Sequence, residues 1–343
     1  MVDKTGKIAP LVAALNQNLV QFGIFHRDLS IDESITPYFG CHSMKMFIRG
    51  KPIRFGFKWW CLCGTDGYPY ALELYAGRET QSDGQQPLGT RVFNHMTDVV
   101  EKHSKTECHQ LFFDNFFTSW ALLTSLTDKN VAATGTVREN RTDGANNVLH
   151  STKDMKKTGK RGDFDYCCDG MVFVLKWHDN SVVSVASNHF THQLVQTANR
   201  RVKGSTSVPV TRPFMVRRYN KGMGGMDLMD RLLANYRPSI CGKPLLTNIL
   251  NVSVIAAWRP HCAVHGSGGM EHIDFRRDIM LCLLKAAQPQ NTPVRKQPVA
   301  ELPTDARRSV ELDHQWVWCS QGRCRICCKN TRIMCCVWRS LAC

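Results

Sequence analysis

Residues 111–117 read LFFDNFF, and this stretch decides the fold of the chain. An apolar run that leads directly into a helix cap, here Thr118 or Ser119, is typical of a buried strand followed by a crossover helix. Asp114 is then a carboxylate at the C-terminal end of a strand, between apolar residues. Charged side chains are rarely buried without a partner. Asp114 is therefore either a ligand or an Asx residue that forms the turn from strand to helix.

The segments around this stretch alternate between helix and strand patterns. Thr65-Asp66-Gly67 is a tight-turn signal between two β-rich runs and predicts a hairpin. The predicted elements are a helix at 11–22, an extended segment at 30–40, hairpin strands at 54–64 and 68–77, a helix at 92–103, the strand reaching Asp114, a helix at 119–130 and a strand at 131–137. This order predicts an α/β fold with helices on the faces of a sheet.

The chain changes character after residue 138. Short strand patterns and a polar, basic loop follow, which indicate an all-β insertion. Helical spacing then returns, and a segment with four prolines and mixed charges is typical of a linker. We therefore expect a first part of the core at 1–138, a β-rich insertion domain at 139–220, a second part of the core at 221–286, a linker at 287–312 and a short cysteine-rich tail at 313–343.

Charge points to a polyanionic partner. The formal net charge is +15 over 343 residues, and residues 200–243 hold ten Lys and Arg against two acids, Asp227 and Asp230. An excess of basic residues raises affinity for nucleic acid and makes it fall with salt. A solvated face is the alternative for any basic run. Aromatic residues are interleaved in this run, which favours DNA or RNA as the partner.

The sequence predicts no membrane association. No apolar stretch reaches the ~18 to 20 residues that span a bilayer, and the N-terminus lacks the pattern of a signal peptide. We expect the protein in the cytosol or nucleus, where the 16 cysteines are free thiols or metal ligands rather than disulfides.

Four acids form a candidate metal site. Asp227 and Asp230 are three residues apart on a predicted helix, so both carboxylates lie on one face. The alternative interpretation of this pair is that both are acids at the start of a helix, where the macrodipole favours negative charge. The alternative for Asp32, in SIDES (30–34), is an ordinary loop acid. Together with Asp114 they suit a hard cation, because Mg²⁺ takes a few carboxylates and keeps its water and substrate phosphate. Two such ions support in-line displacement at phosphorus.

Three longer strings resemble the piggyBac transposases and their domesticated derivatives. They are SIDESITPYFG with FIRGKPIRFGFKWW, LFFDNFFTS with ATGTVREN, and YNKGMGGMDLMDRLLANYRPSI, in family order over about residues 24–285. Long strings in order are far more specific than a short motif. The resemblance implies an RNase H-like core interrupted by an insertion domain. It assigns catalytic metal binding to Asp32, Asp114 and Asp227, with Asp230 beside them.

The same resemblance implies a reaction and its partners. The reaction is Mg²⁺- or Mn²⁺-dependent cleavage at transposon ends, hairpin formation and resolution, then strand transfer into TTAA. The implied partners are transposon-end and target DNA in the nucleus, and a homodimer is compatible with the family. The flanks of the chain are shorter than the family pattern. This leaves three hypotheses open: an active transposase, a domesticated DNA-binding protein that does not cut, and a decaying copy inactive through truncation.

The tail contains one clean C-x-x-C, formed by Cys324 and Cys327, with Cys335 and Cys336 following. This spacing is compatible with one tetrahedral Zn²⁺ site. The family's cross-braced zinc domain needs two ligand sets, which the tail does not supply. Free thiols are the alternative.

Overall fold

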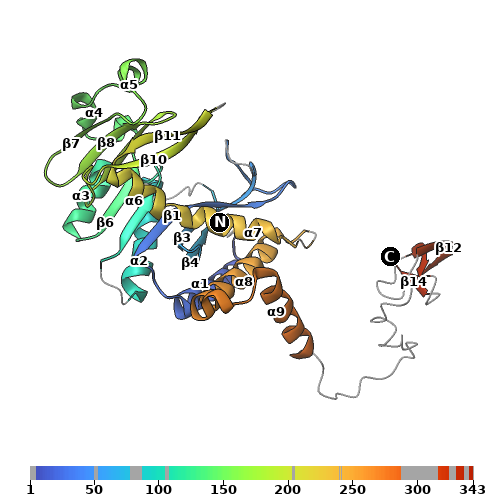
Figure 1. Cartoon of the computed structure of the whole chain (residues 1–343). Coiled ribbons are helices and arrows are strands. Elements are labelled where there is room, and N and C mark those ends of the chain that lie inside the picture. Colours follow the sequence, from blue (N-terminus) through green and yellow to red (C-terminus); the bar gives the residue numbers. More distant parts are fainter. Residues whose placement is uncertain are drawn as a thin grey trace. The chain divides into compact units, whose positions relative to one another are not determined.

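The computed structural model describes two compact units, Met1–Leu283 and Leu284–Cys343, each by itself. The described residues are 5–49, 53–77, 87–104, 108–202, 205–238, 240, 242–286, and the backbone of 316–323, 330–335 and 340–342. Figure 1 shows the first unit as one large sheet with helices packed against it. No helix within the described part of the chain is long and apolar enough to cross a membrane.

A mixed nine-stranded sheet forms the centre of the first unit, in the order β2-β3-β1-β5-β6-β9-β8-β7, with β4 also paired to β3. Its strands are β1 (Asp28–Pro37), β2 (Met46–Phe47), β3 (Phe55–Gly64), β4 (Pro69–Leu74), β5 (Gln110–Phe113), β6 (Ala132–Thr136), β7 (Phe164–Cys168), β8 (Phe173–His178) and β9 (Val182–Ser187). β1, β5 and β6 are parallel neighbours, while the other pairs are antiparallel. The predicted α/β class is confirmed.

Local chemistry explains the elements that sequence predicted. Gly67 has φ of +82° in the turn between β3 and β4, a conformation that glycine adopts without strain. After β5, the Ser119 hydroxyl caps helix α3 (Trp120–Asp128) by accepting from the Leu122 N–H. The hairpin and the strand-to-helix passage at LFFDNFF are therefore both confirmed.

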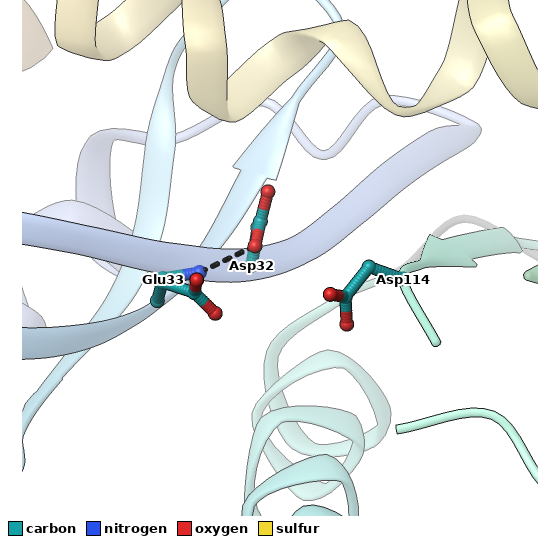
Figure 2. Close-up of side chains that lie close together, drawn as sticks. All are labelled: Asp32, Glu33 and Asp114. Atoms are coloured by element: carbon teal, nitrogen blue, oxygen red, sulfur yellow. Dashed lines mark hydrogen bonds between the residues drawn. The ribbon is translucent and has the colours of Figure 1, made fainter. Parts of the chain in front are cut away.

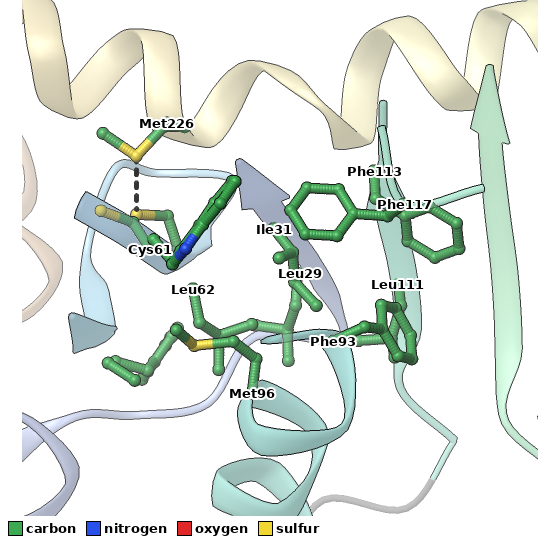
Figure 3. Close-up of a cluster of buried hydrophobic side chains, with 14 of the residues drawn as sticks. Leu29, Ile31, Cys61, Leu62, Phe93, Met96, Leu111, Phe113, Phe117 and Met226 are labelled. Atoms are coloured by element: carbon green, nitrogen blue, oxygen red, sulfur yellow. Dashed lines mark hydrogen bonds between the residues drawn. The ribbon is translucent and has the colours of Figure 1, made fainter. Parts of the chain in front are cut away.

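Helices cover the two faces of the sheet. On one face, Phe93 and Met96 of α2 (Leu88–His103) pack with Leu29, Ile31 and other buried apolar residues, as Figure 3 shows. On the other face lie α6 (Phe214–Gly222) and α7 (Gly224–Asn235). Because successive strand residues alternate in direction, Ser30, Asp32 and Ser34 of β1 point to the α7 face.

The interval 139–220 is rich in strands, as predicted, but it is not all-β. It also contains α4 (Ala145–Val148), α5 (Thr152–Thr158) and the start of α6, besides the separate hairpin β10 (Gln196–Val202) and β11 (Ser205–Arg212). Strand β9 pairs with β6, so β7, β8 and β9 continue the central sheet. This pairing could not be predicted, because backbone hydrogen bonds between strands that are distant in the chain have no side-chain signature. The limits of a separate insertion domain at 139–220 stay a prediction.

The remaining helices pack at one end of the first unit. The side-chain amide of Asn16 in α1 (Ala9–Phe22) makes two hydrogen bonds to the backbone of Leu72. Helix α8 (Pro244–His265) contributes Ile249, Val252 and Ile255 to the core, and α9 (His272–Ala286) follows it. The predicted linker at 287–312 lies outside the described residues. In the tail unit, β12 (Trp316–Arg323), β13 (Asn330–Cys335) and β14 (Ser340–Ala342) form an antiparallel sheet.

Two glycines allow α6 and α7 to lie directly on the sheet. A Cβ at Gly222 would meet the Phe112 ring at 2.3 Å, and a Cβ at Gly225 would meet the Gly64 carbonyl oxygen at 2.2 Å. Both distances are far shorter than any real contact. The close approach therefore requires glycine at both positions.

We predict that Gly225→Ala destabilises the protein by about 1–3 kcal/mol, because the helix must move away from the Gly64 backbone. The neighbouring Gly224 is the matched control, since a Cβ there meets nothing within 4 Å. Gly224→Ala is expected to be neutral or to stabilise by up to about 1 kcal/mol through helix propensity. Urea unfolding of both variants measures the difference. Equal effects of the two substitutions would contradict the close helix-to-sheet contact.

Candidate metal centre

The parallel pairing of β1 and β5 places two predicted acids side by side. The register runs from Asp28 opposite Gln110 to Ile31 opposite Phe113. One further step sets Asp32 opposite Asp114, which is the first residue after β5. Asp114 thus directly follows β5, Asp32 lies midway along β1, and both carboxylates are half-buried. Two acids that are 82 positions apart in the chain become neighbours through strand register alone.

Glu33 joins this pair. Ligand oxygens of Asp32, Glu33 and Asp114 all lie within 4.8 Å of one another, and no other group of three or more potential metal ligands occurs among the described residues. Figure 2 shows Asp32 and Glu33 on β1, with their carboxylates directed to different sides of the strand, and Asp114 across from them. We call these three residues the acidic cluster. Sequence reasoning missed Glu33, although it follows Asp32 directly in the string SIDES.

A lysine lies close to the outer acid of the cluster. Lys58 Nζ is 3.8 Å from Glu33 Oε2, and both side chains are 13% exposed. The same ammonium lies 3.7 Å from the centre of the Trp60 ring and 5.2 Å from that of Phe116. Such cation–π contacts hold an ammonium in place. Lys58 therefore offsets one of the three negative charges, and the cluster keeps a net negative charge.

Local hydrogen bonds orient the two aspartates. Asp32 Oδ1 accepts from the Glu33 N–H at 2.7 Å, and Asp114 Oδ1 accepts from the Phe116 N–H at 2.9 Å. The Asp114 bond is the Asx turn that was the alternative to a ligand role. The two roles are compatible, because a carboxylate has several lone pairs and the turn fixes its direction.

Helix α7 brings the second pair of acids to the same face of β1. The Ser34 hydroxyl donates to Asp230 Oδ1 at 2.6 Å, so Asp230 is tied to the strand that carries Asp32. Asp227 lies one turn earlier in the first turn of α7 and is exposed. The three-residue cation group contains neither of them. Their assignment as ligands stays a prediction.

Tyr219 is a second residue that sequence reasoning did not place at this site. Burial is the main cause that raises the pKa of Tyr219 to about 12. A hydrogen bond with Thr136 lowers this pKa, whereas the negative charges of Asp114, Asp32 and Asp227 raise it further. Its phenol, on α6, thus lies in the field of the three acids to which the resemblance assigns metal binding. At neutral pH the hydroxyl stays protonated and is a donor beside the acids. Interleaved aromatics in the basic run were the only sequence signal for it.

Other residues near these strands and helices serve the fold. Arg218, from the basic run, donates to both carboxylate oxygens of Asp28 at 2.8 and 2.9 Å and to the side chain of Gln110. It therefore fastens α6 to the start of β1 and β5. Cys61 and Cys63 are fully buried strand residues, and burial raises the pKa of both thiols.

The predicted zinc ligands belong to the tail of the chain. Cys324, Cys327 and Cys336 lie outside the described residues, and of Cys335 only its position at the end of β13 is described. A zinc site in the tail stays a prediction. Zinc content of the purified chain, measured with and without Cys324→Ser, is the observation that decides it.

The acidic cluster fits a hard divalent cation. Its donors are all carboxylate oxygens, which Mg²⁺ and Mn²⁺ prefer over nitrogen or sulfur. Like charges at this spacing repel, and a cation is the ordinary means of offsetting that repulsion. Asp32 and Asp114 are the residues that would hold it, with Glu33 beside them.

We predict that Asp32→Asn and Asp114→Asn each weaken Mn²⁺ binding by about tenfold or more, because an amide carries no charge to attract the ion. Asp98→Asn, on an exposed position of α2, is the matched control and should leave the affinity unchanged. Titration of free Mn²⁺ by electron paramagnetic resonance gives the affinities. Identical binding by all three variants would show that the ion lies elsewhere.

Comparison with known proteins shows to which family the chain belongs. The family model described as Transposase IS4 matches residues 1–258. Human PiggyBac transposable element-derived protein 3 is 34% identical, with 97% of this chain and 57% of the relative covered. Human PiggyBac transposable element-derived protein 2 is 31% identical over 95% of this chain and 55% of the relative. The chain thus spans somewhat over half the length of these curated relatives.

A solved structure, the piggyBac transposase synaptic complex with hairpin DNA, has the same fold. The TM-score is 0.64 at 21% identity, over 96% of this chain and 72% of that one. At this identity the likeness supports the fold alone. Because the family model covers most of the chain and the similar human proteins are piggyBac-derived, the chain belongs to the Transposase IS4 family, among its piggyBac-type members.

Proposed function

We propose that the chain carries out metal-dependent phosphoryl transfer on DNA, with Asp32 and Asp114 as metal ligands. One observation carries the proposal: the carboxylates of Asp32, Glu33 and Asp114 converge within 4.8 Å on adjacent parallel strands. When bound there, Mg²⁺ or Mn²⁺ would supply Lewis acidity at a phosphate and lower the pKa of attacking water or hydroxyl.

The residues around the cluster have distinct tasks in this proposal. Asp32 and Asp114 hold the charge that binds the cation, and their backbone hydrogen bonds fix both carboxylates in direction. Asp230, held by Ser34, and Asp227, one turn away, extend the acidic surface toward the DNA. Tyr219 donates a hydrogen bond from a neutral phenol, which suits a phosphate oxygen. Exposed basic residues on α6 and α7, among them Lys221 and Arg231, attract the backbone.

In more detail, we propose that the reaction is cleavage and strand transfer at TTAA, as in piggyBac-type transposition. We propose the nucleus as its location and a homodimer as the active form. These proposals are supported by membership of the family and by a structural neighbour described as a synaptic complex with hairpin DNA. A second candidate is a DNA-binding protein that does not cut. The net charge of +15 favours DNA binding in both cases, so only the chemistry separates them.

The deciding experiment measures nicking and strand transfer of a TTAA-containing duplex with Mg²⁺ or Mn²⁺. We expect Asp114→Asn to lower the rate by at least about a hundredfold, because loss of a metal ligand removes several kcal/mol of transition-state stabilisation. The Asp98→Asn control should keep the wild-type rate. Binding of the same duplex is measured in parallel, at several salt concentrations.

Two results would count against the catalytic proposal. If the wild-type chain binds DNA with a steep salt dependence yet cuts no faster than Asp114→Asn, the non-cutting candidate is the correct one. If it cuts and Asp114→Asn cuts equally well, the acidic cluster is not the catalytic centre.

A further inference from the structure

Four arginines gather on the hairpin side of α6, apart from the acidic cluster. They are Arg161, Arg200, Arg212 and Arg217, and we call them the arginine cluster. Arg200 and Arg212 belong to β10 and β11. Because Gln196 pairs with Arg212 and Arg200 pairs with Val208, both arginines lie on the same face of this hairpin.

One carboxylate serves two of these arginines. Asp179 Oδ1 forms an ion pair with Arg161 Nε, and Asp179 Oδ2 lies 3.2 Å from Arg200 Nε. Arg217 donates to the side-chain oxygen of Gln196, the residue opposite Arg212 in the hairpin. Asp179 is the only carboxylate that forms an ion pair with any of the four within the part of the chain that the structure describes. The cluster thus keeps a large excess of positive charge.

Arg212 has the least compensated environment. Its Nε atom is buried and has no hydrogen-bond partner among the described residues. Burial is the first cause that lowers the pKa of Arg212, and the charges of Arg200 and Arg217 lower it further. Buried donors without partners and crowded like charges both cost stability. A fold that keeps such an arrangement is typical of a binding site for an anion that supplies the missing partner.

Helix α6 connects the arginine cluster to the acidic cluster. Arg217 and Tyr219 are two residues apart, about 200° around the helix, so they point to nearly opposite sides. Tyr219 lies in the field of the acids, while Arg217 lies against the β10–β11 hairpin. A helix with its side chains is about 10–12 Å wide. One DNA duplex, with about 3.4 Å per base pair, is long enough to touch both sites.

We propose that the arginine cluster binds the DNA backbone as a second phosphate site, a few base pairs from the phosphate at the acidic cluster. Guanidinium groups suit this ligand, because their planar donors match the oxygens of a phosphate. The inference rests on the proposed function in that DNA is the ligand, but it does not require the chain to cut.

The test compares wild type with the double variant Arg212→Gln/Arg217→Gln in binding an unrelated 20-base-pair duplex between about 50 and 200 mM salt. Each phosphate contact contributes about 0.9 to the slope of log affinity against log salt, so the slope should fall by about 2. Affinity at the lowest salt should fall by about tenfold or more. Fluorescence anisotropy of labelled DNA gives both quantities.

Thermal unfolding separates a binding role from a structural one. Removing crowded charges should leave the unfolding midpoint unchanged or raise it. The double variant Lys102→Gln/Lys129→Gln, at two exposed cations on α2 and after α3, is the matched control for net charge, and Arg212→Lys/Arg217→Lys should keep most of the slope. An unchanged slope in the arginine-to-glutamine variant, or an equal loss in the lysine-to-glutamine control, overturns the proposal.

The two proposals fail differently in this experiment. If wild-type protein shows no salt-dependent binding of DNA, the proposed function itself fails. If wild type binds and the Gln variant binds equally well while unfolding at a lower temperature, the arginines are structural and only the second phosphate site is wrong.

Discussion

The parallel pairing of β1 with β5 is the constraint on which the candidate site depends. This register ends at Ile31 and Phe113, both buried and facing α2, and it carries Asp32 and Asp114 one step past the last pair. A slip by one residue would turn every side chain of β1 to the other face. The apolar packing below the sheet therefore fixes the position of the acids above it.

The close contact of α7 with the sheet is the second condition. Gly225 lies where any side chain would strike the Gly64 backbone, and only at that distance can Ser34 on β1 reach Asp230 on α7. The GGMDLMD string thus combines two requirements: a glycine, Gly225, that allows the approach and acids that benefit from it. Met226 and Met229 of the same helix complete the contact, because both thioethers lie against the buried Cys63 thiol.

Local patterns predicted much of this architecture. The hairpin turn at Gly67, the cap at Ser119 and the helix carrying Asp227 all follow from short-range chemistry, and they are present. The family strings then gave the acids their order. What sequence could not give was long-range pairing: the addition of β9 to β6, the place of Tyr219 near the acids, and the sharing of Asp179 by two arginines. These depend on how distant segments meet. Glu33 was missed for a different reason, because strand alternation places it on the opposite side from Asp32.

Opposite charges occupy separate places in the first unit. Acids gather where the pairing of β1 with β5 ends, and arginines gather beside the hairpin, with α6 between them. Anomalous diffraction from a crystal soaked in Mn²⁺ tests most directly whether the acids bind a divalent cation. We expect a peak between Asp32 and Asp114, about 2.0–2.3 Å from carboxylate oxygens of both residues. A map without a peak there, at Mn²⁺ concentrations that occupy other sites, would contradict this binding.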